Sequence, residues 1–198
     1  MVTSLGAWAA RLLAAHPRQP DQRSCGASVL VVERALRDEG YAQLLVDGAG
    51  AQRFRAEALG MHRRTTGPVS LSGRLQVPWP RALGTPPWAI AGQLSAARGP
   101  QVVRWGLRRA TLLGAILTAV RSGVAVPLYV GSRWLPRHVV LVVGADDERL
   151  SCYEPNSGRL QSVPRHAFRD GSLGLAGWSR PWCAVLPTES RPGRRTPA

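Results

Sequence analysis

The hydrophobic pattern of the chain changes its period near residue 123, and this change limits the fold more than any other feature of the sequence. Before that point apolar residues recur at helical spacing, as Leu5, Trp8 and Leu12 do. After it they form short runs rich in valine and leucine, which predict strands over residues 124–130, 139–143, 150–153, 160–163 and 182–186. Helices followed by antiparallel strands predict an α+β fold with two segregated layers.

Turn residues set the expected limits of the helical part. We expect helices over residues 4–15, 26–39, 49–59, 85–97 and 110–121, a short strand over 101–105 and a hairpin turn at 146–148. Gly40 stands where a glycine commonly ends a helix. Thr85, followed by two prolines, has the composition of a capped helix start. The proline- and glycine-rich stretch 66–88 predicts a surface loop.

The length and cysteine content favour one reduced domain. The chain has 198 residues, 44% of them hydrophobic, and three cysteines, an odd number that cannot all pair within one chain. The first residues lack the pattern of a signal peptide. The longest apolar run, residues 110–120, is shorter than the ~20 residues that cross a bilayer. We therefore expect one cytoplasmic domain over residues 1–188, without a membrane span, and a disordered basic tail over 189–198.

The formal charge of +14 does not by itself predict a nucleic-acid partner. All 26 basic residues are arginine, whereas phosphate binding gives no reason to exclude lysine. A GC-rich genome explains this composition. The span 58–145 contains 11 arginines and no carboxylate, so one surface is expected to be strongly positive.

Cys25 stands at the start of the helix predicted over 26–39, after prolines that keep the preceding chain extended. The first turn of a helix has unpaired backbone N–H groups and the positive end of the helix dipole, both of which stabilise a thiolate. Gly26 would let the backbone come close to the group that the sulfur attacks. The alternative is an ordinary buried cysteine at a helix edge, and the polar residues before Cys25 argue against burial. We therefore expect Cys25 to be a nucleophile.

His138 is the expected base. It follows a polar turn and begins a strongly apolar strand, and it shares one strand face with every second valine. The other three histidines, His16, His62 and His166, do not begin a predicted strand. A nucleophilic thiol requires a base within hydrogen-bond reach, and a third group must orient that base.

The third group is expected on the next strand, where Glu154 and Asn156 share one face. Either could hold the Nδ1–H of the imidazole. Cys152 and Cys183 lie in the middle of predicted strands, where a cysteine is a small core residue.

The oxyanion of an acyl-transfer intermediate requires two donors. Gln19 could place its side-chain N–H beside the backbone N–H of Cys25, and Gln22 is the alternative. We expect no metal, because the cysteines and histidines lack the short paired spacing of a zinc site. We also expect no cofactor, because no phosphate-binding glycine loop follows a predicted strand.

Together these segments resemble the papain-fold cysteine peptidases, and more closely the branch that includes the bacteriocin-processing leader peptidases. The residues that carry the resemblance are Gln19, Cys25-Gly26, the strand 138–144 and Tyr153-Glu154-Pro155, within the segments 16–42 and 123–160. The resemblance implies Cys25 as nucleophile, His138 as base and Gln19 as oxyanion donor. The aspartate of that branch falls on Glu154, which is one methylene longer.

The resemblance also implies a helical lobe that carries the thiol, a β lobe that carries the imidazole, and a substrate cleft between them. The expected function is a cysteine hydrolase that cleaves a peptide or protein substrate through a thioester. Two alternatives remain open: an acyltransferase on the same scaffold, and a catalytically inactive binding module that uses its arginine-rich surface.

Overall fold

The structure is a computed structural model that describes residues 6–69, 73 and 75–188. The predicted tail 189–198 and the first two residues of the predicted helix 4–15 lie outside the described residues. In chain order the elements are α1 (Ala7–Ala14), α2 (Cys25–Arg37), α3 (Glu39–Val46), α4 (Gly50–Thr66), the 3-10 turn η1 (Arg81–Leu83), α5 (Pro87–Arg98), β1 (Gln101–Trp105), α6 (Arg109–Arg121), β2 (Val126–Gly131), β3 (Pro136–Ala145), β4 (Arg149–Glu154), β5 (Arg159–Pro164), α7 (Arg165–Asp170) and β6 (Arg180–Pro187).

The strands form one six-stranded sheet in the order β1-β6-β2-β3-β4-β5, and every neighbouring pair is antiparallel. With seven α-helices over the described residues, the α+β class predicted from the sequence is confirmed. The hairpin turn at 146–148 is also confirmed. There the Oδ1 of Asp146 accepts the backbone N–H groups of Glu148 and Arg149 at 2.9 and 2.7 Å.

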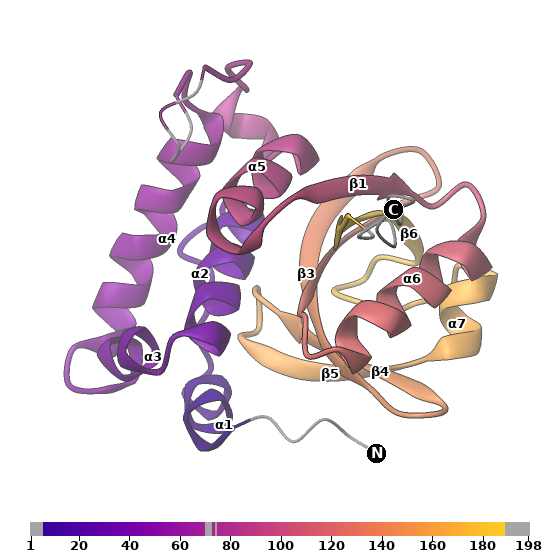
Figure 1. Cartoon of the computed structure of the whole chain (residues 1–198), viewed down its shortest axis with the longest axis horizontal. Helices are drawn as coiled ribbons and strands as arrows, with labels where there is room; N and C mark the ends of the chain where they lie inside the picture. The colour runs from indigo at the N-terminus through magenta and orange to yellow at the C-terminus, as the bar shows by residue number, and fades with distance from the viewer. Residues whose placement is uncertain (1–5, 70–72, 74, 189–198) are drawn as a thin grey trace, which may run out of the picture.

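Helices cover both faces of the sheet, so the prediction of two layers was wrong. Val139, Leu141 and Val143 of β3 pack with α2 in one hydrophobic core, while Val140 and Val142 pack in a second core with residues of α6 and α7. Figure 1 shows α1 to α5 on one side and the curved sheet with α6 and α7 on the other. A strand buried on both faces is apolar at every position, which explains why 139–143 does not alternate.

The predicted helix end at Gly40 was wrong. Helix α2 ends at Arg37, and Asp38, in extended conformation, accepts the N–H of Tyr41 at 3.0 Å and so caps a new helix. Gly40 therefore lies in the first turn of α3. The cap at Thr85 was also wrong, since the α5 cap position is Pro86 without a side-chain bond.

The long loop and the last helix also differ from expectation. Helix α4 continues to Thr66, past the predicted end at residue 59, and the region 66–88 contains the turn η1. Helix α7 was not predicted, because it is a single short segment of six residues between two strands.

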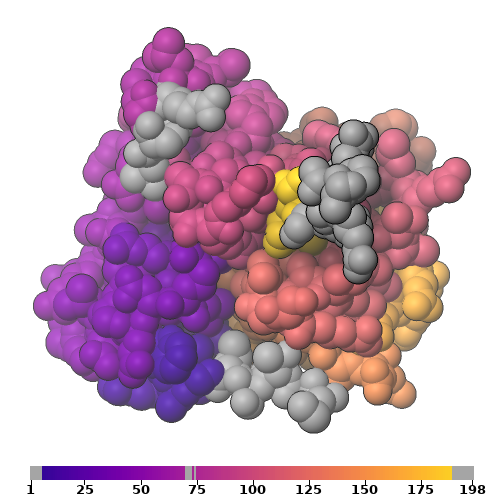
Figure 2. Space-filling view, in the orientation of Figure 1, coloured from indigo at the N-terminus to yellow at the C-terminus, as the bar shows by residue number. Residues whose placement is uncertain are grey.

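A buried ion pair fixes α2 against the rest of the molecule. Glu33 of α2, only 1% exposed, accepts bonds of 2.8 Å from both Arg37 and Arg98. Arg98, at the end of α5, also donates to the backbone carbonyl of Ala125, just before β2. Figure 2 shows the two halves of the molecule that this junction joins: the helices on the left, indigo to magenta, and the sheet with α6 and α7 on the right.

Candidate active site

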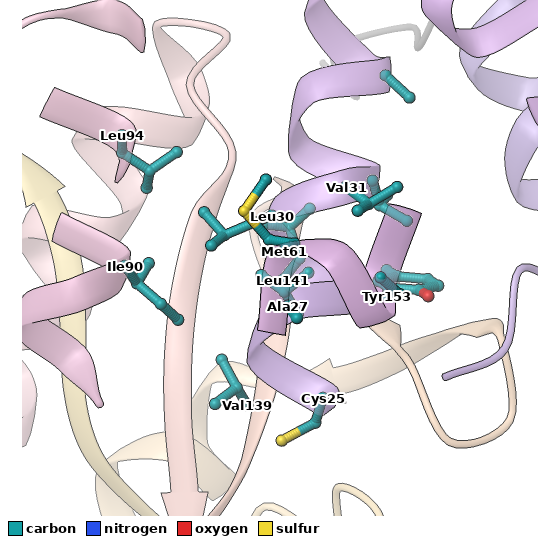
Figure 3. Packing of buried hydrophobic residues seen from close by; sticks show 14 of the residues in the cluster. Cys25, Ala27, Leu30, Val31, Met61, Ile90, Leu94, Val139, Leu141 and Tyr153 are labelled. Atoms are coloured by element: carbon teal, nitrogen blue, oxygen red, sulfur yellow. The ribbon is translucent and has the colours of Figure 1, made fainter. Parts of the chain in front are cut away.

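Cys25 is the first residue of α2 and is 6% exposed. Figure 3 shows its sulfur at the end of the helix, directed away from Ala27 and Leu141 of the core. The side chain of Ser24 does not cap the helix, because its hydroxyl exchanges hydrogen bonds with the backbone of Asp21. The first intrahelical bond runs from Ser28 N–H to Ser24 C=O, so the N–H groups of the preceding turn remain free to stabilise an anion.

The side chain of His138, the third residue of β3, lines the same cavity as Cys25, and its interaction with Cys25 is one of the causes that raise its pKa. Its Nε2 lies 2.8 Å from the Oε1 of Glu154. A carboxylate only accepts, so Nε2 carries the proton in this bond, and Nδ1 is the ring nitrogen left for the thiol. The prediction that the third group holds Nδ1–H was therefore wrong: Glu154 holds Nε2–H.

The pairing of β3 with β4 brings Glu154 to the imidazole. Leu141 pairs with Tyr153, so the antiparallel register places His138 diagonally across from Glu154 on the same face. The carboxylate, 1% exposed, also accepts the backbone N–H groups of Asn156 at 2.7 Å and Ser157 at 2.8 Å. One side chain thus bonds both the ring and the turn after β4.

Asn156, the other candidate for the third group, is exposed. It contributes its backbone N–H to Glu154 and its backbone carbonyl to Arg18, and within the described residues its side chain forms no hydrogen bond. The geometry therefore favours Glu154 over Asn156 as the group that orients His138.

The two glutamines lie in different surroundings. The backbone N–H of Gln19 donates to Pro155 C=O at 2.8 Å, and its side-chain Oε1 is buried without a hydrogen-bond partner among the residues that the structure describes. Gln22 is exposed and lines the cavity that also contains Cys25. The side chain of Gln19 does not line that cavity.

The pKa values of His138 and Glu154 are both shifted by the groups that surround them. Burial lowers the pKa of His138, but the hydrogen bonds and charges of Cys25 and Glu154 outweigh burial and raise it from 6.5 to about 9. Burial raises the pKa of Glu154, but the bonds from His138, Ser157 and Asn156 outweigh it and lower it from 4.5 to about 2. At neutral pH the site therefore holds an imidazolium beside a carboxylate.

Cys152 and Cys183 lie in a different environment from Cys25, because both are buried inside strands of the sheet. All three thiols are free, and burial raises the pKa of Cys152 and of Cys183 to about 12. Both lie inside strands with 0% exposure, so they stay protonated and unreactive.

A cavity of 490 Å³ opens beside Cys25 and His138. One wall comes from the chain before α2 and from residues 79–88, and the other comes from β1, β2 and the start of β3. The hydroxyl of Tyr129 donates to Thr85 C=O at 2.8 Å and so joins the two walls. Sequence reasoning missed Trp79 and Trp88 because residues 66–88 have no periodic pattern. It missed Tyr129 because this residue cannot be told from the other core residues of the predicted strand 124–130.

Gly26 has a different role from the one expected. A Cβ at this position would lie 2.8 Å from the Cβ of Thr85 and 3.2 Å from the Cδ1 of Ile90. The close approach that requires glycine is thus between α2 and the start of α5, not between the backbone and a substrate.

Within the described ranges, no cluster of three or more histidine, cysteine or acidic side chains could hold a metal ion. No helix of the described part is long and apolar enough to cross a membrane. Comparisons with protein-family models, curated proteins and solved structures found no match.

Proposed function

We propose that this protein is a papain-like cysteine hydrolase, of the branch that includes the bacteriocin-processing leader peptidases, which cleaves a peptide or related amide bond. The observation that carries the proposal is the placement of Cys25 and His138 at one cavity of 490 Å³, with the His138 ring bonded to Glu154 at 2.8 Å and its pKa raised by Cys25 and Glu154. A thiol at the start of a buried helix and an imidazole on an antiparallel sheet support the papain-like assignment. Three unpaired cysteines support a cytoplasmic location.

In the first half-reaction the Cys25 thiolate attacks the carbonyl carbon of the substrate. A C–S bond forms, and the carbonyl electrons move to oxygen, where the Cys25 N–H and a glutamine amide stabilise the oxyanion. As the intermediate collapses, the C–N bond breaks and the His138 imidazolium gives its proton to the leaving amine. A thioester remains on Cys25.

In the second half-reaction water attacks the thioester carbonyl while His138 accepts its proton. The C–S bond breaks, the carboxylic acid leaves, and the thiolate and imidazolium are restored. Glu154 holds Nε2–H throughout, so that Nδ1 keeps facing the sulfur.

Thiol alkylation tests the nucleophile without knowledge of the substrate. At about pH 6 an ordinary thiol, with a reference pKa of ~8.5, is almost entirely protonated. We expect iodoacetamide to modify native wild-type protein at Cys25 at least about tenfold faster than the unfolded chain at this pH. Mass spectrometry of the digested protein identifies the modified residue. The His138→Ala variant should lose the rate advantage, and Cys152 and Cys183 should stay unmodified.

Hydrolysis of a mixture of fluorogenic peptide amides tests the reaction itself. Replacement of Cys25 by alanine should reduce the rate by more than about 10³-fold. Retained activity in Cys25→Ala would overturn the proposal, as would alkylation of native Cys25 at the rate of unfolded thiols. Acyl products on added amines would instead indicate a transferase, and an unreactive Cys25 would indicate a binding module.

Separate substitutions of the two glutamines identify the oxyanion donor. If Gln19 is the donor, Gln19→Glu should lower kcat by about 10²-fold or more while Gln22→Glu has a small effect. The reverse result would assign the role to Gln22.

A further inference from the structure

The walls of the active-site cavity come almost entirely from the span without acidic residues. All but three of the lining residues, namely Gln22, Arg23 and Cys25, belong to residues 58–145, which contain no aspartate or glutamate. None of the three exceptions is an acidic residue. The walls of the cavity therefore present no carboxylate to a substrate.

Two arginines stand at the cavity, one on each side of the reacting pair. Arg23 lies two residues before Cys25, and Arg137 directly precedes His138; both are exposed and line the cavity. Within the described residues neither guanidinium forms an ion pair with an acidic side chain. Glu154 does not compensate them, because it is buried behind His138 and bonded to the ring and the following turn.

The remaining lining is aromatic and apolar. Trp79 and Trp88 pack edge to face with 5.0 Å between their ring centres, and Trp105 faces the cavity from β1. Trp88 is 44% and Trp105 54% exposed, and Leu135 beside them is 51% exposed. Large apolar side chains that stay exposed around one cavity mark a binding surface.

We propose that this cavity binds an acidic peptide segment, with an apolar side chain against Trp79, Trp88 and Trp105 and a carboxylate paired with Arg23 and Arg137. The inference rests on the proposed function in one respect, namely that the bound segment is the substrate of Cys25. Charge complementarity selects this occupant, because guanidinium groups without partners bind carboxylates and repel basic segments. The chemistry at Cys25 makes no use of either arginine, so this preference is separate from the reaction.

The test uses the Cys25→Ala protein, which binds a peptide without turnover. The probes are two acetylated hexapeptides with the same central leucine and glycine, one with glutamate at its outer positions and one with lysine. Quenching of tryptophan fluorescence measures Kd. We expect the glutamate peptide to bind at least about tenfold more tightly at low salt, with the difference reduced at 0.5 M salt.

Reversing the charge of Arg23 or Arg137 tests whether these two residues cause the preference for the glutamate peptide. Arg23→Glu and Arg137→Glu, each combined with Cys25→Ala, should remove or invert the preference, and the Arg→Gln versions should reduce it. The matched control is Arg169→Glu, which changes an exposed arginine of α7 that does not line the cavity. This control should keep the full preference. Equal affinities for the two peptides, or the same loss in the control, would overturn the inference.

These experiments distinguish a failure of the hydrolase proposal from a failure of the proposed preference for acidic peptides. If the glutamate peptide binds preferentially but wild-type protein does not cleave it, the hydrolase proposal fails and the binding preference stands. If the wild type cleaves both peptides with the same kcat/KM, the charge inference fails and the hydrolase proposal stands.

Discussion

At the scale of single residues, Glu154 determines the geometry of the site. Its carboxylate accepts three bonds, from His138 Nε2 and from the backbone of Asn156 and Ser157. An aspartate would be one methylene shorter and could not span the same distance from this backbone. The longer side chain therefore suits the turn that follows β4.

We predict that the stabilisation by Glu154 depends on pH, with a maximum between the two ordinary pKa values of 4.5 and 6.5. Its pKa is lowered to about 2 in the folded state, so its contribution is present above 4.5 and is lost as pH falls toward 2. The pKa of His138 is raised to about 9, so the imidazolium contributes fully below 6.5 and its contribution is lost as pH rises through 9.

Thermal unfolding of wild type and Glu154→Gln from about pH 3 to 9.5 measures this dependence. The difference in Tm between the two should be largest between about pH 5 and 6.5 and should shrink on both sides. A difference that stays constant over the whole range would contradict the coupling of Glu154 to His138.

The sequence predicted Cys25 and His138 from their places at the starts of a helix and a strand, and in the structure both side chains line one cavity. The sequence did not decide whether Glu154 or Asn156 orients His138, because strand alternation places both on the same face. The choice depends on where β4 ends, and the sequence does not fix an element end to within two residues. Which ring nitrogen of His138 bonds the carboxylate depends on the diagonal position of Glu154, and the pairing register of β3 with β4 sets that position.

At the scale of elements, α2 is the central piece of the helical half. It is buried along most of its length, and it packs against the sheet, α4 and α5. Its position relative to α5 is set where the backbone of Gly26 touches Thr85 and Ile90. The same contact sets the position of Cys25 above the cavity.

We predict that Gly26→Ala lowers the free energy of unfolding by about 1–3 kcal/mol, because the new Cβ forces α2 and α5 apart. Urea denaturation followed by circular dichroism measures the change. Gly114→Ala on the exposed face of α6 is the matched control, since its Cβ would meet nothing within 4 Å and alanine favours helix. Unchanged stability in Gly26→Ala would contradict the proposed close packing.

Most elements were predictable because their apolar residues follow one period. The break between α2 and α3 was not, because a glycine after an apolar run is a common helix end and Asp38 gives a competing cap signal. Which signal prevails is decided by the burial of Tyr41, Ala42 and Leu45 against the other helices.

At the scale of the whole molecule, one buried carboxylate joins the helices to the sheet. Glu33 receives Arg37 from its own helix and Arg98 from α5, and Arg98 continues to the backbone before β2. The sequence identified the α+β class but not this junction, because an ion pair between residues 65 positions apart leaves no local pattern.

We predict that Glu33→Gln lowers the free energy of unfolding by about 3–5 kcal/mol, since it leaves Arg98 buried without a counter-charge. Guanidinium denaturation measures the loss. Arg37→Gln is the control, because Arg37 is partly exposed and its loss leaves the bond of Arg98 to Glu33 in place. Its effect should be about 1 kcal/mol or less. Equal losses in both variants would contradict a special role for Arg98.

The place of β6 in the sheet has a consequence for biosynthesis. Within the described part of the chain, β1 pairs with β6 alone, through Trp105 opposite Cys183 among other residues. A nascent polypeptide that has not yet released residues 180–187 from the ribosome can pair β2, β3 and β4, but it has no strand to hold β1. Trp105 then lacks its pairing partner, so the cavity wall that it forms is completed only when residues 180–187 have left the ribosome.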